Sequence, residues 1–294
     1  MAERLDVEDT LGRYLARGES DIRGELEAMG LLYHGLPHAR EVKWGATLIA
    51  LVMREVNPGL MTSRDVRVEG FRAFGHDRVM MEDSRTDTPE PYERILRTYR
   101  YGENERQSAD RTITYMALAN QRSGQTLFTQ EDMDVTREAY TATIPSHDFS
   151  LGTVEQPYLE LATSLKAFPT PLADINLCGM AEPDYFLKMS DRLFLEFNID
   201  IYEAIRSGQP LPAEIKEFYK ERVLEWTGDG QPKFVQGRKK RLPEDLGLLS
   251  EELREPVRAL FPNFDGALIC LGRAYERRKE MTFEGIVDEM QITP

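Results

Sequence analysis

The sequence contains few cysteines, histidines and tryptophans. Of its 294 residues, two are cysteine, four are histidine and two are tryptophan. Cys178 and Cys270 cannot build a disulfide framework; one bridge stays open as an alternative, but the pattern favours reduced thiols. The first 15 residues lack the apolar stretch of a secretory signal. We therefore expect a cytoplasmic protein.

Positive charge and long apolar runs are also scarce. The chain has 37 Lys and Arg residues against 51 Asp and Glu residues, which gives a formal net charge of −14. Nucleic acids and anionic membranes both bind clustered cations, so neither is the expected partner. The longest apolar run, 44–53, is about half of the ~20 residues that a membrane span needs. The expected partner is a small-molecule substrate, and the oligomeric state stays open.

Several motifs of well-known enzyme classes are absent too. The sequence has no GxGxxG, Walker loop, HExxH, CxxC or GxSxG. The segment 266–272 around Cys270 resembles the cysteine-ligand loop of cytochromes P450, and 34–38 resembles an early His-Gly segment of haem-thiolate peroxidases. However, the chain is too short for the first family, and no cysteine precedes Cys178, where the second family places its ligand. Neither family is assigned.

The apolar residues that are present predict a mainly α-helical, compact fold. Hydrophobic residues make up 41% of the chain, which is enough for a sizeable core. The segment 40–56 predicts a central core helix that is apolar on nearly all sides, and 183–206 predicts a second one. Amphipathic helices are expected to pack around both. Thr62 and Thr129 each precede an aspartate by three residues, which predicts a capping box at two helix starts.

Three other segments carry structural predictions. Residues 66–81 are ambiguous between helical and alternating spacing: a short helix is expected, with a small β element as the alternative. Residues 92–101 predict a helix, and 227–241 predict a polar loop that carries the basic cluster 238–241. The chain 1–294 is expected to be a single helical domain, with a subdomain boundary near 145–152 as an alternative.

The segment HGLPH places two imidazoles four residues apart. His34 and His38 could share one metal ion or act as acid–base groups, with Glu41 as an orienting group or third ligand. Pro37 is expected to interrupt helix there, so the two rings would have to converge through a turn. The alternative is a loop whose histidines cap the core helix or bond to the backbone.

His76 and Glu82 are second catalytic candidates. His76 could act as a general base if a carboxylate oriented its ring. Asp77 follows it directly, but neighbouring residues on a regular element point apart, so this pair is not expected to form a dyad by itself. A surface turn is the alternative for both residues.

Two function classes follow from these features. The first is a small-molecule enzyme with a pocket between helices; either a divalent metal or haem would be compatible with it as cofactor. The second is a non-catalytic helical protein-interaction module with an acidic surface. A core without a cavity, and histidines scattered on the surface, would favour the second class.

Overall fold

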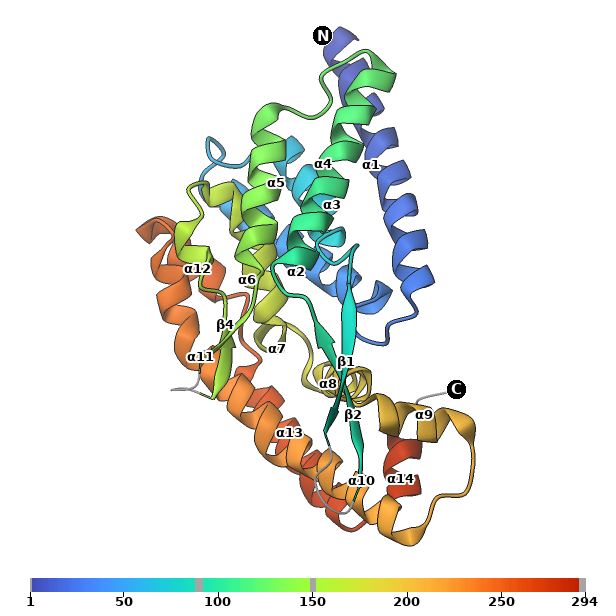
Figure 1. Cartoon of the computed structure of the whole chain (residues 1–294). Coiled ribbons are helices and arrows are strands. Elements are labelled where there is room, and N and C mark those ends of the chain that lie inside the picture. Colours follow the sequence, from blue (N-terminus) through green and yellow to red (C-terminus); the bar gives the residue numbers. More distant parts are fainter. Residues whose placement is uncertain (1, 88–91, 149–151, 291–294) are drawn as a thin grey trace.

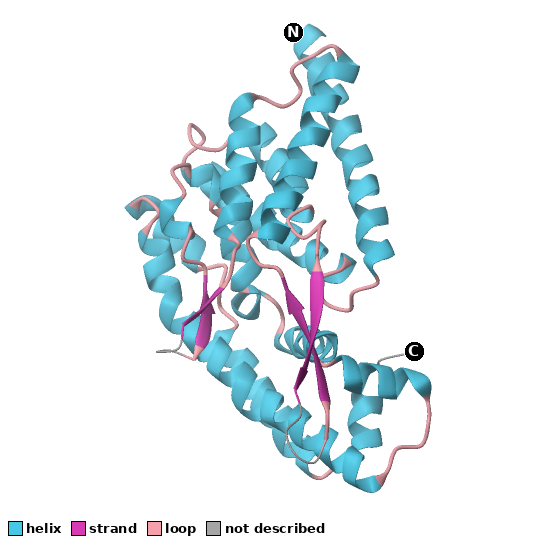
Figure 2. Ribbon diagram, viewed as in Figure 1, coloured by secondary structure: helices cyan, strands magenta, loops and turns pink. Residues whose placement is uncertain are grey.

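Helices dominate the structure, a computed structural model that describes residues 2–87, 92–148 and 152–290 (Figures 1 and 2). This confirms the mainly α fold. The N-terminal half contains the helices α1 (Ala2–Met29), α2 (Leu36–Val56), α3 (Ser63–Phe74), α4 (Glu103–Ser123) and α5 (Gln130–Ala142). The rest contains α6 (Pro169–Ile175), α7 (Leu177–Met180), α8 (Pro183–Phe197), α9 (Ile199–Ser207), α10 (Ala213–Glu225), α11 (Gln231–Gly247), α12 (Glu251–Arg258), α13 (Phe264–Lys279) and α14 (Phe283–Glu289).

Two antiparallel strand pairs and two short 3-10 helices, Leu159–Leu161 and Leu165–Ala167, complete the described fold. β1 (Glu82–Asp87) pairs with β2 (Arg94–Tyr99), and β3 (Ser146–Asp148) pairs with β4 (Thr153–Glu155). Figure 1 shows the first pair running from the N-terminal helices, at the top, towards α8 and α10. The ambiguous segment 66–81 is helical up to Phe74. The small β element begins at Glu82, just after the end of this segment. The helix predicted over 92–101 is wrong, because Arg94–Tyr99 pairs with β1 instead.

The predicted core helix is present as α2. Val42, Ala46, Ile49 and Ala50 are completely buried in it, and the helix packs along α3 and α6. The prediction that this helix is buried on nearly all sides is wrong in part, since Trp44 is 47% exposed. The hydrophobic effect therefore holds α2 in the interior by one broad face.

The start of α2 corrects the reading of Pro37. The helix begins at Leu36, so Pro37 lies in its first turn. A proline is tolerated there because its missing N–H would have no partner within the helix. His38 is consequently a helical residue in the first turn of α2, and it is buried.

The approach of α2 to α6 depends on a glycine. A Cβ atom at Gly45 would lie 3.0 Å from the Cβ of Ala173 and 3.1 Å from the Sδ of Met180. Contacts this short would push the helices apart, so the absence of a side chain permits the close packing. Asp174 follows Ala173 directly and is thereby brought towards α2.

The second core helix is divided in two. α8 ends at Phe197 and α9 begins at Ile199. The side-chain amide of the intervening Asn198 donates a hydrogen bond of 2.6 Å to the carbonyl of Phe194. The backbone N–H of Asn198 donates to the same carbonyl, so the side chain adds a second hydrogen bond where α8 ends.

The prediction of a polar loop over 227–241 is wrong. A π-helical segment, Trp226–Gly230, leads directly into α11. Pro232 is in the first turn of α11, where it is tolerated. From the basic cluster, Arg238 is buried and donates to Asn176, to the carbonyl of Val154 and to Asp245. Tertiary partners thus outweighed the local preference of the glycines and proline.

Two remaining predictions concern a subdomain boundary and membrane-spanning helices. The boundary near 145–152 includes residues 149–151, which lie outside the described residues, and it stays a prediction. Within the described ranges, no helix has the length and apolar content needed to cross a bilayer.

Candidate functional site

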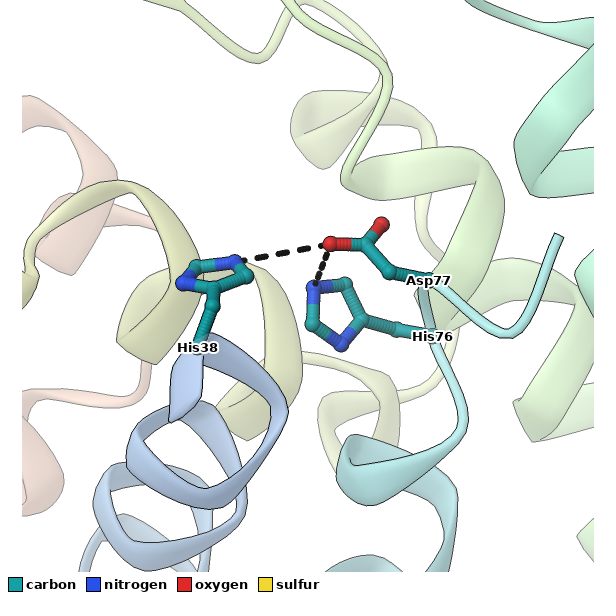
Figure 3. Close-up of side chains that lie close together, drawn as sticks. All are labelled: His38, His76 and Asp77. Carbon is teal, nitrogen blue, oxygen red and sulfur yellow. Dashed lines mark ion pairs between the residues drawn. The ribbon is translucent and has the colours of Figure 1, made fainter. Parts of the chain in front are cut away.

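Two histidines and two aspartates converge beside α2, and we call them the donor group: His38, His76, Asp77 and Asp174. The Nε2 atom of His38 lies 3.0 Å from Oδ1 of Asp174 and 3.5 Å from Oδ2 of Asp77. The Nε2 atom of His76 lies 3.1 Å from Oδ2 of Asp77 and 3.6 Å from Oδ1 of Asp174. Figure 3 shows both rings turned towards one carboxylate oxygen of Asp77.

A turn after α3 brings His76 and Asp77 together. α3 ends at Phe74, and the hydroxyl of Tyr140 donates 2.7 Å to the carbonyl of Arg72 in its last turn. Asp77 lies beyond the end of the helix, so the alternation of a regular element does not apply to it. The expectation that His76 and Asp77 point apart is therefore wrong.

The backbone fixes the protonation of the His76 ring. Nδ1 of His76 lies 2.9 Å from the carbonyl oxygen of Ala73. A carbonyl only accepts hydrogen bonds, so Nδ1 carries the hydrogen. In the neutral ring, Nε2 then directs a lone pair at the carboxylates of Asp77 and Asp174. A proton at this buried nitrogen completes an ion pair with Asp77 and Asp174. The arrangement is stable only with a proton or a cation at Nε2.

The carboxylates of the donor group hold their charge. Burial alone would lower the pKa of His76, but Asp77 and Asp174 raise it well above the usual value. Burial alone would raise the pKa of Asp77, yet the neighbouring His76 ring lowers it overall. The pKa of Asp174 is likewise lowered, against the effect of burial, by hydrogen bonding with His38 and His76. Two carboxylate charges thus face two imidazoles.

The dimensions of the donor group suit one metal ion. One ligand atom each of His38, His76 and Asp77 lies within 4.8 Å of the others. Ligands bonded at ~2.0–2.2 Å to one tetrahedral ion stand ~3–4 Å apart, so small shifts would complete the coordination. A metal-bound histidine usually donates its other ring N–H to a carbonyl or carboxylate, as His76 does to Ala73. The side-chain amide of Gln156 donates a hydrogen bond of 3.3 Å to Oδ2 of Asp174 and so helps to hold that carboxylate in place.

His34, predicted as a metal ligand with His38, binds a different carboxylate. Its Nδ1 lies 2.5 Å from Oε1 of Glu196, a buried residue near the end of α8. Glu196 also accepts from the backbone N–H of Tyr33 and the hydroxyl of Tyr99. Burial alone would lower the pKa of His34, but the Glu196 carboxylate raises it. The centroids of the His34 and His38 rings are 5.7 Å apart, so the two rings are neighbours with separate partners.

The other two sequence candidates lie apart from the donor group. Glu41 is near Tyr185, whose pKa is raised by burial and by this carboxylate. Glu82 is on β1 and its carboxylate forms an ion pair of 2.8 Å with Arg97. Asp174 and Glu196, which contact the two histidines, were not recognised in the sequence. No local signal marks either one among the 51 acidic residues.

Three members of the donor group and His34 border a cavity of about 560 Å³, within the usual range for small-molecule sites. His38, Asp77 and Asp174 line it together with His34. Glu105 also lines it, and burial raises the pKa of this carboxyl to about 7. The cavity thus combines imidazoles and carboxylates, the side chains that commonly bind metals, with a carboxyl that can carry a proton near neutral pH.

Comparison with protein-family models, curated proteins and solved structures gives no match for this chain.

Proposed function

We propose that the protein is a metal-dependent hydrolase that acts on the ester bond of a small molecule, with phosphoesters as the foremost class. The donor group would hold one divalent transition-metal ion. The observation that carries the proposal is the convergence of two imidazoles and two carboxylates on one point beside a cavity.

The type of ion follows from the ligand atoms. Imidazole nitrogens favour zinc, iron and related metals, whereas carboxylates also suit manganese. A set of two imidazoles and two carboxylates therefore fits Mn²⁺, Fe²⁺, Co²⁺ or Zn²⁺. The two aspartate charges balance the two positive charges of such an ion. A bound cation would take the place of the proton that His76 otherwise holds at Nε2.

The bound ion, His34 and Glu196 would have separate roles in hydrolysis. A bound divalent ion lowers the pKa of water and polarises a phosphoryl or carbonyl group. In the reaction, the oxygen of water would bond to phosphorus or carbon while that water loses a proton to solvent. The ester bond would break, and the leaving alcohol would take a proton from the protein. Glu196 engages Nδ1 of His34, so Nε2 is the ring atom that faces a ligand and can supply that proton. Glu196 would act as the positioning residue for which the sequence had suggested Glu41.

Two alternatives receive less support. A protein-interaction module was expected to have no cavity and scattered histidines, whereas the chain has a cavity of about 560 Å³ bordered by several of them. A haem cofactor would need an axial ligand beside a flat slot. Here four donors converge on one point instead, which suits an ion better.

Turnover by the metal-loaded protein tests the proposal. The protein would be stripped with EDTA, reloaded with Mn²⁺, Co²⁺ or Zn²⁺, and assayed with bis(4-nitrophenyl) phosphate, 4-nitrophenyl phosphate and 4-nitrophenyl acetate. We expect hydrolysis of at least one phosphoester that depends on metal and falls at least 100-fold in Asp174→Asn. Asp83→Asn is the matched control, since Asp83 is exposed and pairs with Arg100. Absence of metal-dependent turnover on the whole series would contradict the proposal.

A further inference from the structure

A row of aromatic rings leads from the donor group along the cavity. The ring of His38 neighbours that of His34 at 5.7 Å, and His34 neighbours Phe197 at 6.4 Å. Phe197 in turn neighbours Trp226 at 6.4 Å, with the two planes at 73°. All four side chains line the cavity. The row is therefore continuous along the cavity lining from His38 to Trp226.

The polar edge of Trp226 is already occupied inside the protein. Its Nε1 donates 2.9 Å to the hydroxyl of Ser190 and 3.2 Å to the carbonyl of the same residue. The indole is thereby held in one orientation and contributes its apolar surface to the cavity. Phe197 is likewise only partly buried. These two rings offer a ligand a preformed aromatic surface, which costs little ordering when it binds.

The backbone around Trp226 is specialised. Trp226 begins the π-helical segment Trp226–Gly230, and such segments occur often at functional sites. Both Trp226 and Gly230 line the cavity. On the outer side of the segment, a Cβ at Gly228 would lie 2.5 Å from the Tyr275 ring, so only glycine permits this packing. The irregular turn is fixed from outside and presents its tryptophan inward.

We infer that the cavity takes a substrate with a planar aromatic body, which lies against Phe197 and Trp226 while the ester bond reaches the donor group. Aromatic rings in offset or edge-to-face contact gain more than the buried area alone provides. The placement of the ester rests on the proposed function. The binding of the aromatic body does not, because the surface formed by Phe197 and Trp226 requires no metal.

A matched pair of neutral ligands tests this inference on metal-free protein. N-benzylacetamide and N-(cyclohexylmethyl)acetamide share one amide group and differ in the aromaticity of the ring. We expect calorimetric titration of EDTA-treated protein to show ~3- to 10-fold tighter binding of the benzyl compound. No binding of the benzyl compound, or equal binding of both compounds, would overturn the inference. Loss of metal-dependent turnover would leave this result unchanged, so the two proposals fail separately.

The place of binding can be read from fluorescence. Trp44→Phe leaves Trp226 as the single tryptophan of the chain. We expect its emission to change saturably with the benzyl compound, at the dissociation constant found by calorimetry. Phe197→Ala should weaken binding ~3- to 10-fold, while Tyr158→Ala, at a 40% exposed aromatic residue, should not. Unchanged Trp226 emission at saturation would show that the ligand binds elsewhere and would also overturn the inference.

Discussion

The Nε2 atom of His38 lies 3.0 Å from Oδ1 of Asp174, although 136 positions separate the two residues in the chain. This contact joins the start of α2 to the end of α6. It depends on how closely the two helices pack, because each residue is held by its own helix. The chemistry proposed for the donor group is thus coupled to the packing of the core.

The packing at Gly45 provides the first prediction. Gly45→Val would place side-chain atoms against Ala173 and Met180, where even a Cβ is tightly fitted. Overpacking of this kind costs ~1–3 kcal/mol and moves backbone. We expect lower stability in urea unfolding and at least ~10-fold weaker metal binding, since α6 carries Asp174. Gly24→Val is the control, because a Cβ at Gly24 meets nothing within 4 Å; an equal loss of metal affinity in both variants would refute the coupling.

Metal removal should lower thermal stability. A ligand at 100 times its dissociation constant stabilises the folded state by ~2.7 kcal/mol. For a chain of this size, that corresponds to a melting temperature ~5 °C higher with metal than with EDTA. The shift should be absent in Asp174→Asn, which lacks one charged ligand. A shift of the same size in the variant would mean that the ion binds outside the donor group.

The buried pair of His34 and Glu196 predicts a pH effect. The pKa of His34 is raised above its usual 6.5, so charged His34 contributes stability fully below that pH. The contribution is lost as the pH rises through the folded-state pKa. In Glu196→Gln, burial dominates and the pKa of His34 should fall. NMR titration of the His34 ring, assigned with His34→Gln, measures both values, and a pKa unchanged by Glu196→Gln would contradict the pairing.

These results also show what the sequence could reveal. The capping boxes at Thr62 and Thr129 were predicted and are confirmed, because each depends on residues three positions apart. The core helix at 40–56 was found for the same reason, through its local apolar run. His38 and His76 were selected as candidates because histidines are scarce.

The rest could not be predicted because it depends on distant contacts. Asp174 becomes part of the donor group only through the packing of α6 on α2. His34 acquires Glu196 as a partner 162 positions away. The local pattern of Arg94–Tyr99 predicts a helix because its adjacent Ile95 and Leu96 fit either structure, and pairing with β1 decides for a strand.

One capping box predicts a change in acid stability. Burial alone would raise the pKa of Asp132, but hydrogen bonds from Arg64 and Thr129 lower it below 3.8. Its contribution is therefore present above pH 3.8 and is lost as the pH falls through the folded-state pKa. We expect Asp132→Asn to cost ~1–3 kcal/mol at pH 7 and less at pH 3, as measured by urea unfolding. Asp134→Asn, on the same helix and bonded to Gln130, is the control.

The metal content of the purified protein tests the central claim most directly. Elemental analysis by mass spectrometry would compare the wild-type chain, loaded with Mn²⁺ or Zn²⁺ and desalted, with His76→Gln and with the control Asp83→Asn. The account predicts about one ion per chain in the wild type and the control, and a small fraction of that in His76→Gln. A wild-type chain without bound metal, or a His76→Gln variant that retains it in full, would contradict the account.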